Sequence, residues 1–231
     1  MVGAAISHPA ITVAADLWDS RPLSILQTTP ANFPPALASR GVTQGEVRAI
    51  LHVDLAGKLL DHLILAYTAP ELAAELNAAI RDWEFEPARQ RGEPIGARSE
   101  VTFSFEARGL IISVSGADAV RAGPPRLIGD EMISLVCRAA ELDEPLRAVH
   151  TVPPRHPGKQ APASPRPAAV VDFYIDGEGR PRLPVVTRAA HELYAVAALD
   201  ALLQWQFAPP RRRGQPVIVR ATQIFAFSER S

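Results

Sequence analysis

Side chains that commonly bind metal ions gather around one short turn near residue 57. They are His52, Asp54, Asp61 and His62. Imidazole and carboxylate groups are usual zinc ligands, and the turn could bring His62 near His52 and Asp54, which are two residues apart in a predicted strand. A solvated polar strand face explains the same residues, and the later half of the chain has Tyr174 and Pro184 at the matching His positions. We therefore expect no metal site.

The strongest basic cluster is Arg211–Arg213, with Arg220 nearby. Its simplest interpretation is a solvated turn between a helix and a strand, and the alternative is a site for an acidic partner segment or a peptidoglycan-linked anion. The chain has 24 Lys and Arg against 25 Asp and Glu, a net charge of −1. Because the charge is balanced and no aromatic residues are interleaved with the arginines, we expect no nucleic acid partner.

Catalytic motifs are missing from the sequence. It has no Gly-x-Ser-x-Gly, no Cys/His pair and no glycine loop of the kind that binds phosphates. The carboxylates Glu84 and Glu86 become Gln206 and Ala208 at the matching positions, which is typical of surface residues. Cys137 is the single cysteine, and we expect it to be a buried apolar side chain. These observations predict a protein without catalytic activity and without a cofactor.

An internal repeat organises the chain. Trp83-x-Phe85-x-Pro87 recurs 122 residues later as Trp205-x-Phe207-x-Pro209, and ten of the 23 positions from Trp83 to Phe105 are identical at this offset. The repeat predicts two copies of one unit. The expected organisation is residues 1–18 as a leader or disordered end, 19–106 as the first domain, 107–142 as a connector and 143–231 as the second domain.

Each copy reads as strand, strand, helix, strand, which predicts an α+β fold. Alternating apolar residues indicate strands at 47–53 and 59–66, joined by the turn Asp54–Lys58, and at 170–175 and 180–186, joined by Asp176–Gly179. A third strand follows a Gly-x-Pro turn. We expect one main helix to pack on each three-stranded antiparallel sheet (β-β-α-β), with a short extra helix at 33–41 in the first copy only.

The main helix of the first copy is predicted to begin at Thr68, as an N-cap in a capping box with Glu71, and to run to about Asp82. Residues at spacings of three and four define one apolar face on each helix. In the first copy these are Leu72, Leu76, Ala79, Ile80 and Trp83, and in the second Tyr194, Ala198, Ala201, Leu202 and Trp205. We expect both tryptophans to be core anchors.

The segments outside the copies give weaker signals. The connector contains a Gly-Pro-Pro turn at 123–125 and a short predicted helix at 130–141. Val13-Ala14-Ala15 is similar to a signal-peptidase site, so residues 1–18 are either the tail of a leader or a disordered end. Trp18 either packs on the first copy or marks a contact. No apolar run approaches the ~18 residues that a membrane-spanning helix needs.

The combined motifs resemble the TonB C-terminal domain family. In the first copy the matching motifs are Phe33-Pro34, Gly41, Gly45-Glu46-Val47, Asp54–Gly57, Trp83–Ala88 and Gly92–Ile95. In the second copy they are Asp176–Gly179, Trp205–Pro209 and Gly214–Val217. The residues that define the structural motif are Trp83, Phe85, Pro87, Gly92, Pro94, Trp205, Phe207, Pro209, Gly214 and Pro216.

The resemblance implies a periplasmic, non-catalytic module that binds an extended peptide, the Ton box of an outer-membrane transporter, beside its last strand. The strands that would pair with the peptide are 95–105 and 217–227. The implied binding residues are Ile95, Ala97, Arg98, Ser99, Val101, Phe103, Val217, Val219, Arg220, Ala221, Gln223 and Phe225. The alternative is a structural or assembly protein that self-associates, for instance as a homodimer, through the same strands.

Overall fold

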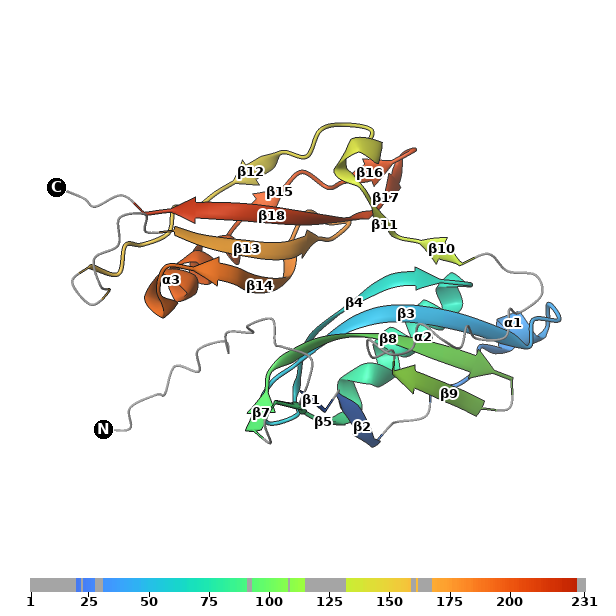
Figure 1. The fold of residues 1–231 in the computed structure, drawn as a ribbon. Coiled ribbons are helices and arrows are strands. Elements are labelled where there is room, and N and C mark those ends of the chain that lie inside the picture. Colours follow the sequence, from blue (N-terminus) through green and yellow to red (C-terminus); the bar gives the residue numbers. More distant parts are fainter. Residues whose placement is uncertain are drawn as a thin grey trace, which may run out of the picture.

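The computed structural model describes residues 20–21, 23–27, 31–90, 93–107, 109–114, 132–158, 161 and 168–227. Within these residues the protein is a mixed α+β structure, mostly strand, with three α-helices and several antiparallel sheets (Figure 1). The α+β class that the sequence predicts is therefore confirmed. Several sequence predictions lie outside the described residues, namely the leader, Trp18, Gly92 and the turn at 123–125.

The larger sheet, called here the first sheet, has five strands in the order β10-β4-β3-β8-β9, all antiparallel. Their bounds are β3 Gln44–Val53, β4 Leu59–Tyr67, β8 Ala97–Glu106, β9 Gly109–Val114 and β10 Ile133–Ser134. The predicted hairpin of β3 and β4 is confirmed, with Val47 opposite Tyr67 and Leu51 opposite His62.

The second sheet has four strands in the order β11-β18-β13-β14. Their bounds are β11 Val136–Cys137, β13 Ala168–Ile175, β14 Pro181–Ala189 and β18 Ile218–Ala226. The predicted β13–β14 hairpin is confirmed, and β18 pairs with β13 along eight consecutive positions. All pairs are antiparallel except β11 with β18, which is parallel.

Short strands connect these sheets to the rest of the chain. They are β1 Ser20–Arg21, β2 Ser24–Gln27, β5 Glu84–Glu86, β6 Ala88–Gln90, β7 Glu93–Ile95, β12 Ala148–His150, β15 Gln206–Phe207, β16 Arg211–Arg212 and β17 Gln215–Pro216. They pair as β1-β6-β7, β2-β5, β12-β15 and β16-β17. The segments after each main helix are thus held by backbone pairing.

The helices are α1 Pro35–Ala38, α2 Pro70–Ala79 and α3 Glu192–Leu202, and a 3-10 turn, Ile80–Asp82, extends α2. The prediction of a capping box at Thr68 is wrong. The N-cap is Ala69, without a side-chain bond, because the Thr68 hydroxyl instead accepts a hydrogen bond from the Glu46 N–H at 2.9 Å. Thr68 thereby ties the start of α2 to β3.

Each main helix packs on one face of its sheet. The predicted helix faces are confirmed, since Leu72, Leu76 and Ile80 are buried on α2, and Tyr194, Ala198 and Leu202 are buried on α3. On the first sheet α2 covers alternate residues of β3, which are Val47, Ala49, Leu51 and Val53. On the second sheet α3 covers Ala169, Val171, Phe173 and Ile175 of β13.

Two predictions about strand number and connector structure are wrong. The sheets have five and four strands rather than three, because neighbouring segments pair with strands that were expected to lie at the edges. The predicted helix at 130–141 is replaced, from residue 133, by β10, β11 and a 3-10 turn at Ala139–Glu141. Here Leu135 donates its N–H to Leu65 and accepts from the Ile218 N–H, so the connector extends both sheets.

The sheet faces without helices pack against each other. Ile50, Leu63 and Leu65 of the first sheet form one buried cluster with Leu183 and Ile218 of the second. Figure 1 shows the second sheet above the first, with the connector strands β10 and β11 joining them on one side. These faces are in contact only in part, since Arg48, Glu100, Arg220 and Ile224 on the same faces are exposed.

Each β-hairpin turn is built around an aspartate and a glycine. Asp54 accepts hydrogen bonds from the backbone of Ala56 and Lys58, and Asp176 accepts them from Glu178 and Arg180. The turn glycines Gly57 and Gly179 have φ near +80°.

Both turn glycines also lie against the strand that follows the helix. A Cβ at Gly57 or Gly179 would overlap the carbonyl oxygen of Phe85 or Phe207, respectively. Only glycine combines the left-handed conformation with this close approach. The turn and the Trp-x-Phe motif are thus parts of one contact.

We predict that Gly179→Ala lowers the free energy of unfolding by about 2 kcal/mol or more, because it adds a backbone overlap to left-handed strain. Gly41→Ala is a matched control, since Gly41 also has φ +80° but has open space around it. It should cost about 1 kcal/mol. Urea denaturation of both variants measures the difference, and equal losses would show that the contact with Phe207 contributes nothing.

Candidate functional site

The predicted binding strand of the first copy is not at a sheet edge. β9 pairs with the second half of β8, from Val101 opposite Val114 to Glu106 opposite Gly109. The expectation that 95–105 forms an open edge is therefore wrong for residues 101–105. The edge is covered because the chain beyond the predicted domain boundary at residue 106 forms β9, which pairs with β8. Only the backbone of 97–100 lacks a strand partner on that side within the described residues.

The corresponding strand of the second copy keeps an open edge. β11 covers β18 only at Ile218 and Val219. From Arg220 to Ala226, β18 has β13 on one side and no strand on the other among the residues that the structure describes. The seven residues 220–226 of β18 are called here the open edge.

Backbone direction along the open edge follows from one hydrogen bond. The Ile218 N–H points away from β13, since it donates to the Leu135 carbonyl at 2.7 Å. Alternate residues of an antiparallel pair direct their N–H and C=O groups to opposite sides, and the β13–β18 register is continuous. The outward groups are therefore those of Arg220, Thr222, Ile224 and Ala226, and the β11 pairing at Val219 already engages the N–H of Arg220.

The predicted binding residues divide between core and surface. Val101, Phe103, Val217, Val219 and Phe225 are buried, whereas Ala97, Arg98, Ser99, Ala221 and Gln223 are half-buried and Arg220 is exposed. Ile95 lies in β7, outside the main sheet. Buried side chains of this set cannot contact a partner directly, so a strand-adding partner would bind mainly through backbone groups.

The exposed face of the open edge carries a small polar network. Arg220 and Thr222 both donate to the Asp172 carboxylate, at 2.8 and 2.7 Å. Burial acts to raise the pKa of Asp172, but the bonds from Thr222 and Arg220 outweigh it and hold that pKa below its usual value. Ile224, 61% exposed, lies beyond this network.

The residues of the structural motif hold the helix ends to the sheets. Trp83 is buried with its ring centroid 5.5 Å from that of Phe103. Trp205 is half-buried, lies 5.3 Å from the Phe225 ring and donates its Nε1–H to the Val152 carbonyl at 2.9 Å. Phe85 and Phe207 are buried, whereas Pro87 and Pro94 are half-buried and Pro209, Gly214 and Pro216 are exposed. The prediction that both tryptophans anchor the core is confirmed.

Arg98, predicted to contact a partner, instead contacts the second sheet. Its Nη1 donates to the Leu183 carbonyl at 2.6 Å, and its guanidinium lies 5.7 Å from the Tyr174 ring centroid. Burial lowers the pKa of Arg98 from its usual value. The residue is therefore a tie between the sheets, which the sequence pattern did not reveal.

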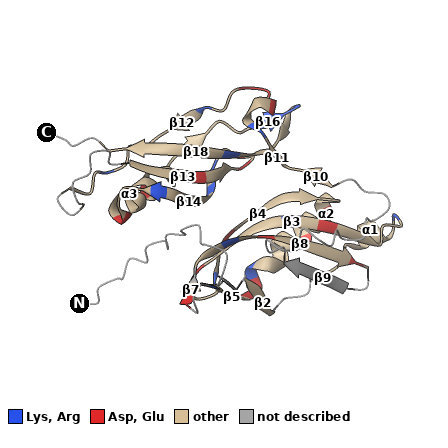
Figure 2. Ribbon diagram, viewed as in Figure 1, with Lys and Arg blue, Asp and Glu red and all other residues tan. Residues whose placement is uncertain are grey.

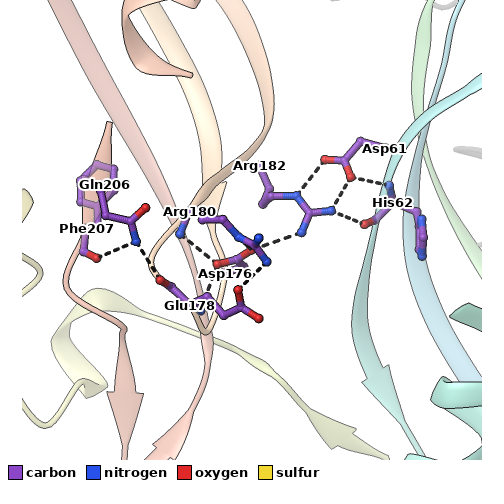
Figure 3. A network of polar contacts seen from close by, with 8 residues as sticks. All are labelled: Asp61, His62, Asp176, Glu178, Arg180, Arg182, Gln206 and Phe207. Atoms are coloured by element: carbon purple, nitrogen blue, oxygen red, sulfur yellow. Dashed lines mark hydrogen bonds and ion pairs between the residues drawn. The ribbon is translucent and has the colours of Figure 1, made fainter. Parts of the chain in front are cut away.

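A second tie between the sheets is centred on Arg182, which no motif had singled out (Figure 3). Its Nε donates to Asp61 at 3.0 Å, its Nη2 donates to Asp61 and to the His62 carbonyl, and its Nη1 donates to Asp176 at 3.2 Å. The hydrogen bond that Arg182 donates to the Asp61 carboxylate raises the pKa of Arg182. Asp176 is only 6% exposed, so Arg182 neutralises one well-buried carboxylate and one on the facing sheet.

The two histidines considered for a metal site lie on opposite faces of the first sheet. Directly paired residues share a face, so the register places His52 with Asp61, and His62 with the buried Leu51. The His62 ring is 2.8 Å from the Asn77 amide oxygen of α2. Burial lowers the pKa of both imidazoles. Within the described residues no group of three or more His, Cys, Asp or Glu side chains could hold a metal ion.

No known protein family matches the chain, and no curated protein matches it either. The part of the chain that the structure describes has no helix long and apolar enough to cross a membrane. Cys137 is buried, as predicted, and burial raises the pKa of its thiol.

We predict that Arg182→Met lowers the free energy of unfolding by about 1–3 kcal/mol, because Asp61 and Asp176 lose their shared cation in a half-buried setting. Methionine keeps an apolar stem of similar length. Arg48→Met is the control, since Arg48 pairs with Glu100 at 3.5 Å on an exposed surface and should cost less than about 0.5 kcal/mol. Similar urea midpoints for the two variants would contradict the importance of the tie.

Proposed function

We propose that the chain is a non-catalytic protein-binding module with two units of the TonB C-terminal type. Two features support the repeat. The strand order β4-β3-β8 in one sheet corresponds to β14-β13-β18 in the other. The close approach of Gly57 to Phe85 also corresponds to that of Gly179 to Phe207. The residues of both contacts are among those that the 122-residue offset matches.

The open edge of β18 is the observation that carries the proposed function. At Thr222, Ile224 and Ala226 the backbone groups point outward and no strand among the described residues pairs with them, although the Ile224 carbonyl accepts a hydrogen bond from the Gln223 side chain at 2.8 Å. Such groups can pair with an extended chain of suitable direction. The same edge in the first unit is largely covered by β9. We therefore assign peptide binding to the second unit, and we assign the first unit a supporting role.

The partner is proposed to be an extended peptide, with the Ton box of an outer-membrane transporter as the leading candidate, and the location is proposed to be the periplasm. These proposals rest on the motif resemblance. The surroundings of the open edge are compatible with such a ligand, since the edge has an exposed arginine and an exposed isoleucine on one face. A bound peptide would be held by backbone pairing, with side chains adding selectivity.

Self-association is the second candidate function, and the exposure of Ile224 favours it. An uncovered strand with an exposed apolar side chain is a template for pairing with a second copy. In that case the second unit of one molecule would pair with that of another, edge to edge. The two candidates use the same backbone groups and would compete with each other.

We predict that Ile224→Pro weakens binding of a Ton-box-like peptide at least about tenfold, because it removes one outward N–H and leaves the ladder to β13 intact. Ile224→Ala keeps that N–H and should bind within about threefold of the native protein. Calorimetric titration of both variants measures the affinities.

Gln223→Pro controls for backbone direction, since the Gln223 N–H points toward β13. It should cost about 3 kcal/mol of stability. Equal binding by the native protein and Ile224→Pro would exclude strand addition at β18. Dimers in sedimentation that Ile224→Pro dissociates would favour self-association instead.

A further inference from the structure

A large open cleft lies between the two sheets, away from the open edge of β18. Its volume is about 1320 Å³, and its walls come from β4, α2 with the 3-10 turn after it, β10, the start of β18, the β13–β14 turn and the β16–β17 hairpin. Leu63, Leu135 and Ile218 contribute apolar surface. None of the residues 220–226 lines it. The cleft is thus a separate surface from the proposed peptide edge.

Arginines dominate the charges of this cleft. Its lining includes Arg81, Arg180, Arg182, Arg212 and Arg213, against Glu141, Asp176 and Glu178. Figure 2 shows basic residues in blue at β16, beside the connector strand β11. Five cations against three carboxylates give an excess of two positive charges, before internal pairing is considered.

Internal pairing uses all three carboxylates. Asp176 and Glu178 are bound by Arg180, and Asp176 also by Arg182. Glu141 accepts from the backbone N–H and the guanidinium of Arg138. For Arg81, Arg212 and Arg213, by contrast, no carboxylate of the described residues lies within 4.0 Å. Arg81 and Arg213 therefore have no carboxylate partner there, whereas Arg212 donates to the Ser134 carbonyl at 3.4 Å and acts on Glu141 from beyond ion-pair distance.

The hairpin that carries two of these arginines is held in a costly conformation. Arg213 has φ +53° and Gly214 has φ +75°, and a non-glycine residue in this region is disfavoured. The Asp143 carboxylate accepts the N–H groups of Arg213 and Gly214 at 2.7 and 2.8 Å. Asp143 thereby holds the turn that places Arg212 and Arg213 at the cleft.

We propose that this cleft binds an acidic segment of a partner protein, whose carboxylates pair with Arg81, Arg212 and Arg213. Guanidinium groups bind carboxylates through paired, charge-assisted hydrogen bonds. The volume exceeds the usual ~300–1000 Å³ of small-molecule sites, which favours a chain segment over a small ligand. Arg81 follows α2 and the other two arginines belong to β16–β17, so the segment contacts both units.

The test is calorimetric titration of the full chain with a short, end-blocked glutamate peptide at low salt. We expect saturable binding with one site, weakened about tenfold by Arg81→Gln or Arg212→Gln and further reduced as salt screens the pairs. Arg213→Gly removes the third guanidinium and relieves the left-handed strain, so it should weaken binding without loss of stability. A reduced affinity in a stable variant cannot be attributed to unfolding.

Arg188→Gln is the matched control, because Arg188 is exposed on β14 and does not line the cleft. It should leave the affinity unchanged. An equal loss of affinity in Arg188→Gln would show that the peptide responds only to the overall charge of the protein. Absence of saturable binding to the native protein would overturn the proposal. Binding of inorganic triphosphate but not of the peptide would also overturn it and would assign the cleft to phosphate groups. Ile224→Pro should bind the glutamate peptide normally, which separates this site from the proposed edge.

Discussion

The packing of the two sheets through their helix-free faces is the constraint on which the rest of the structure depends. Each sheet has one face covered by its own helix, and the other face would expose leucine and isoleucine side chains without a second sheet. Arg98 and Arg182 close the border of this apolar contact with hydrogen bonds to the facing sheet. With the helix-bearing faces covered and the helix-free faces in contact at Ile50, Leu63 and Ile218, the surfaces left for a partner are edges, clefts and the exposed part of the helix-free face around Arg220 and Ile224.

The short strands that follow the main strands determine which sheet edges remain without a pairing strand. Residues 133–137 extend the first sheet at β4 and the second at β18, and the segment after β8 turns back to cover that strand. Backbone groups at a sheet edge need a partner or water, so each added strand removes a potential docking site. Among the described residues, no strand covers the seven residues of β18 beyond Val219. The two sheets therefore share a strand order but differ in which edge is open.

The sequence predicted the features that local chemistry determines. Alternation in β3 and β13, the Asp-x-x-Gly turns and the apolar faces of α2 and α3 all give strong local signals, and these elements are present. Features set by distant contacts were missed. Thr68 was expected to cap α2 but binds Glu46 of a neighbouring strand, and the alternating residues of 133–137 became strands because two sheet edges were within reach. The role of Arg182 could not be predicted from the sequence, because its partner Asp61 lies 121 residues away along the chain.

The most direct test of the account is amide hydrogen exchange along β18, measured by NMR in the monomeric protein with and without a Ton-box-like peptide. The account predicts that the amides of Thr222, Ile224 and Ala226 exchange much faster than their neighbours in the free protein and become protected when the peptide saturates. Protection of these three amides in the free monomer would show that the edge is already covered. Unchanged exchange at saturating peptide would show that any binding occurs elsewhere, and either result would contradict the central claim.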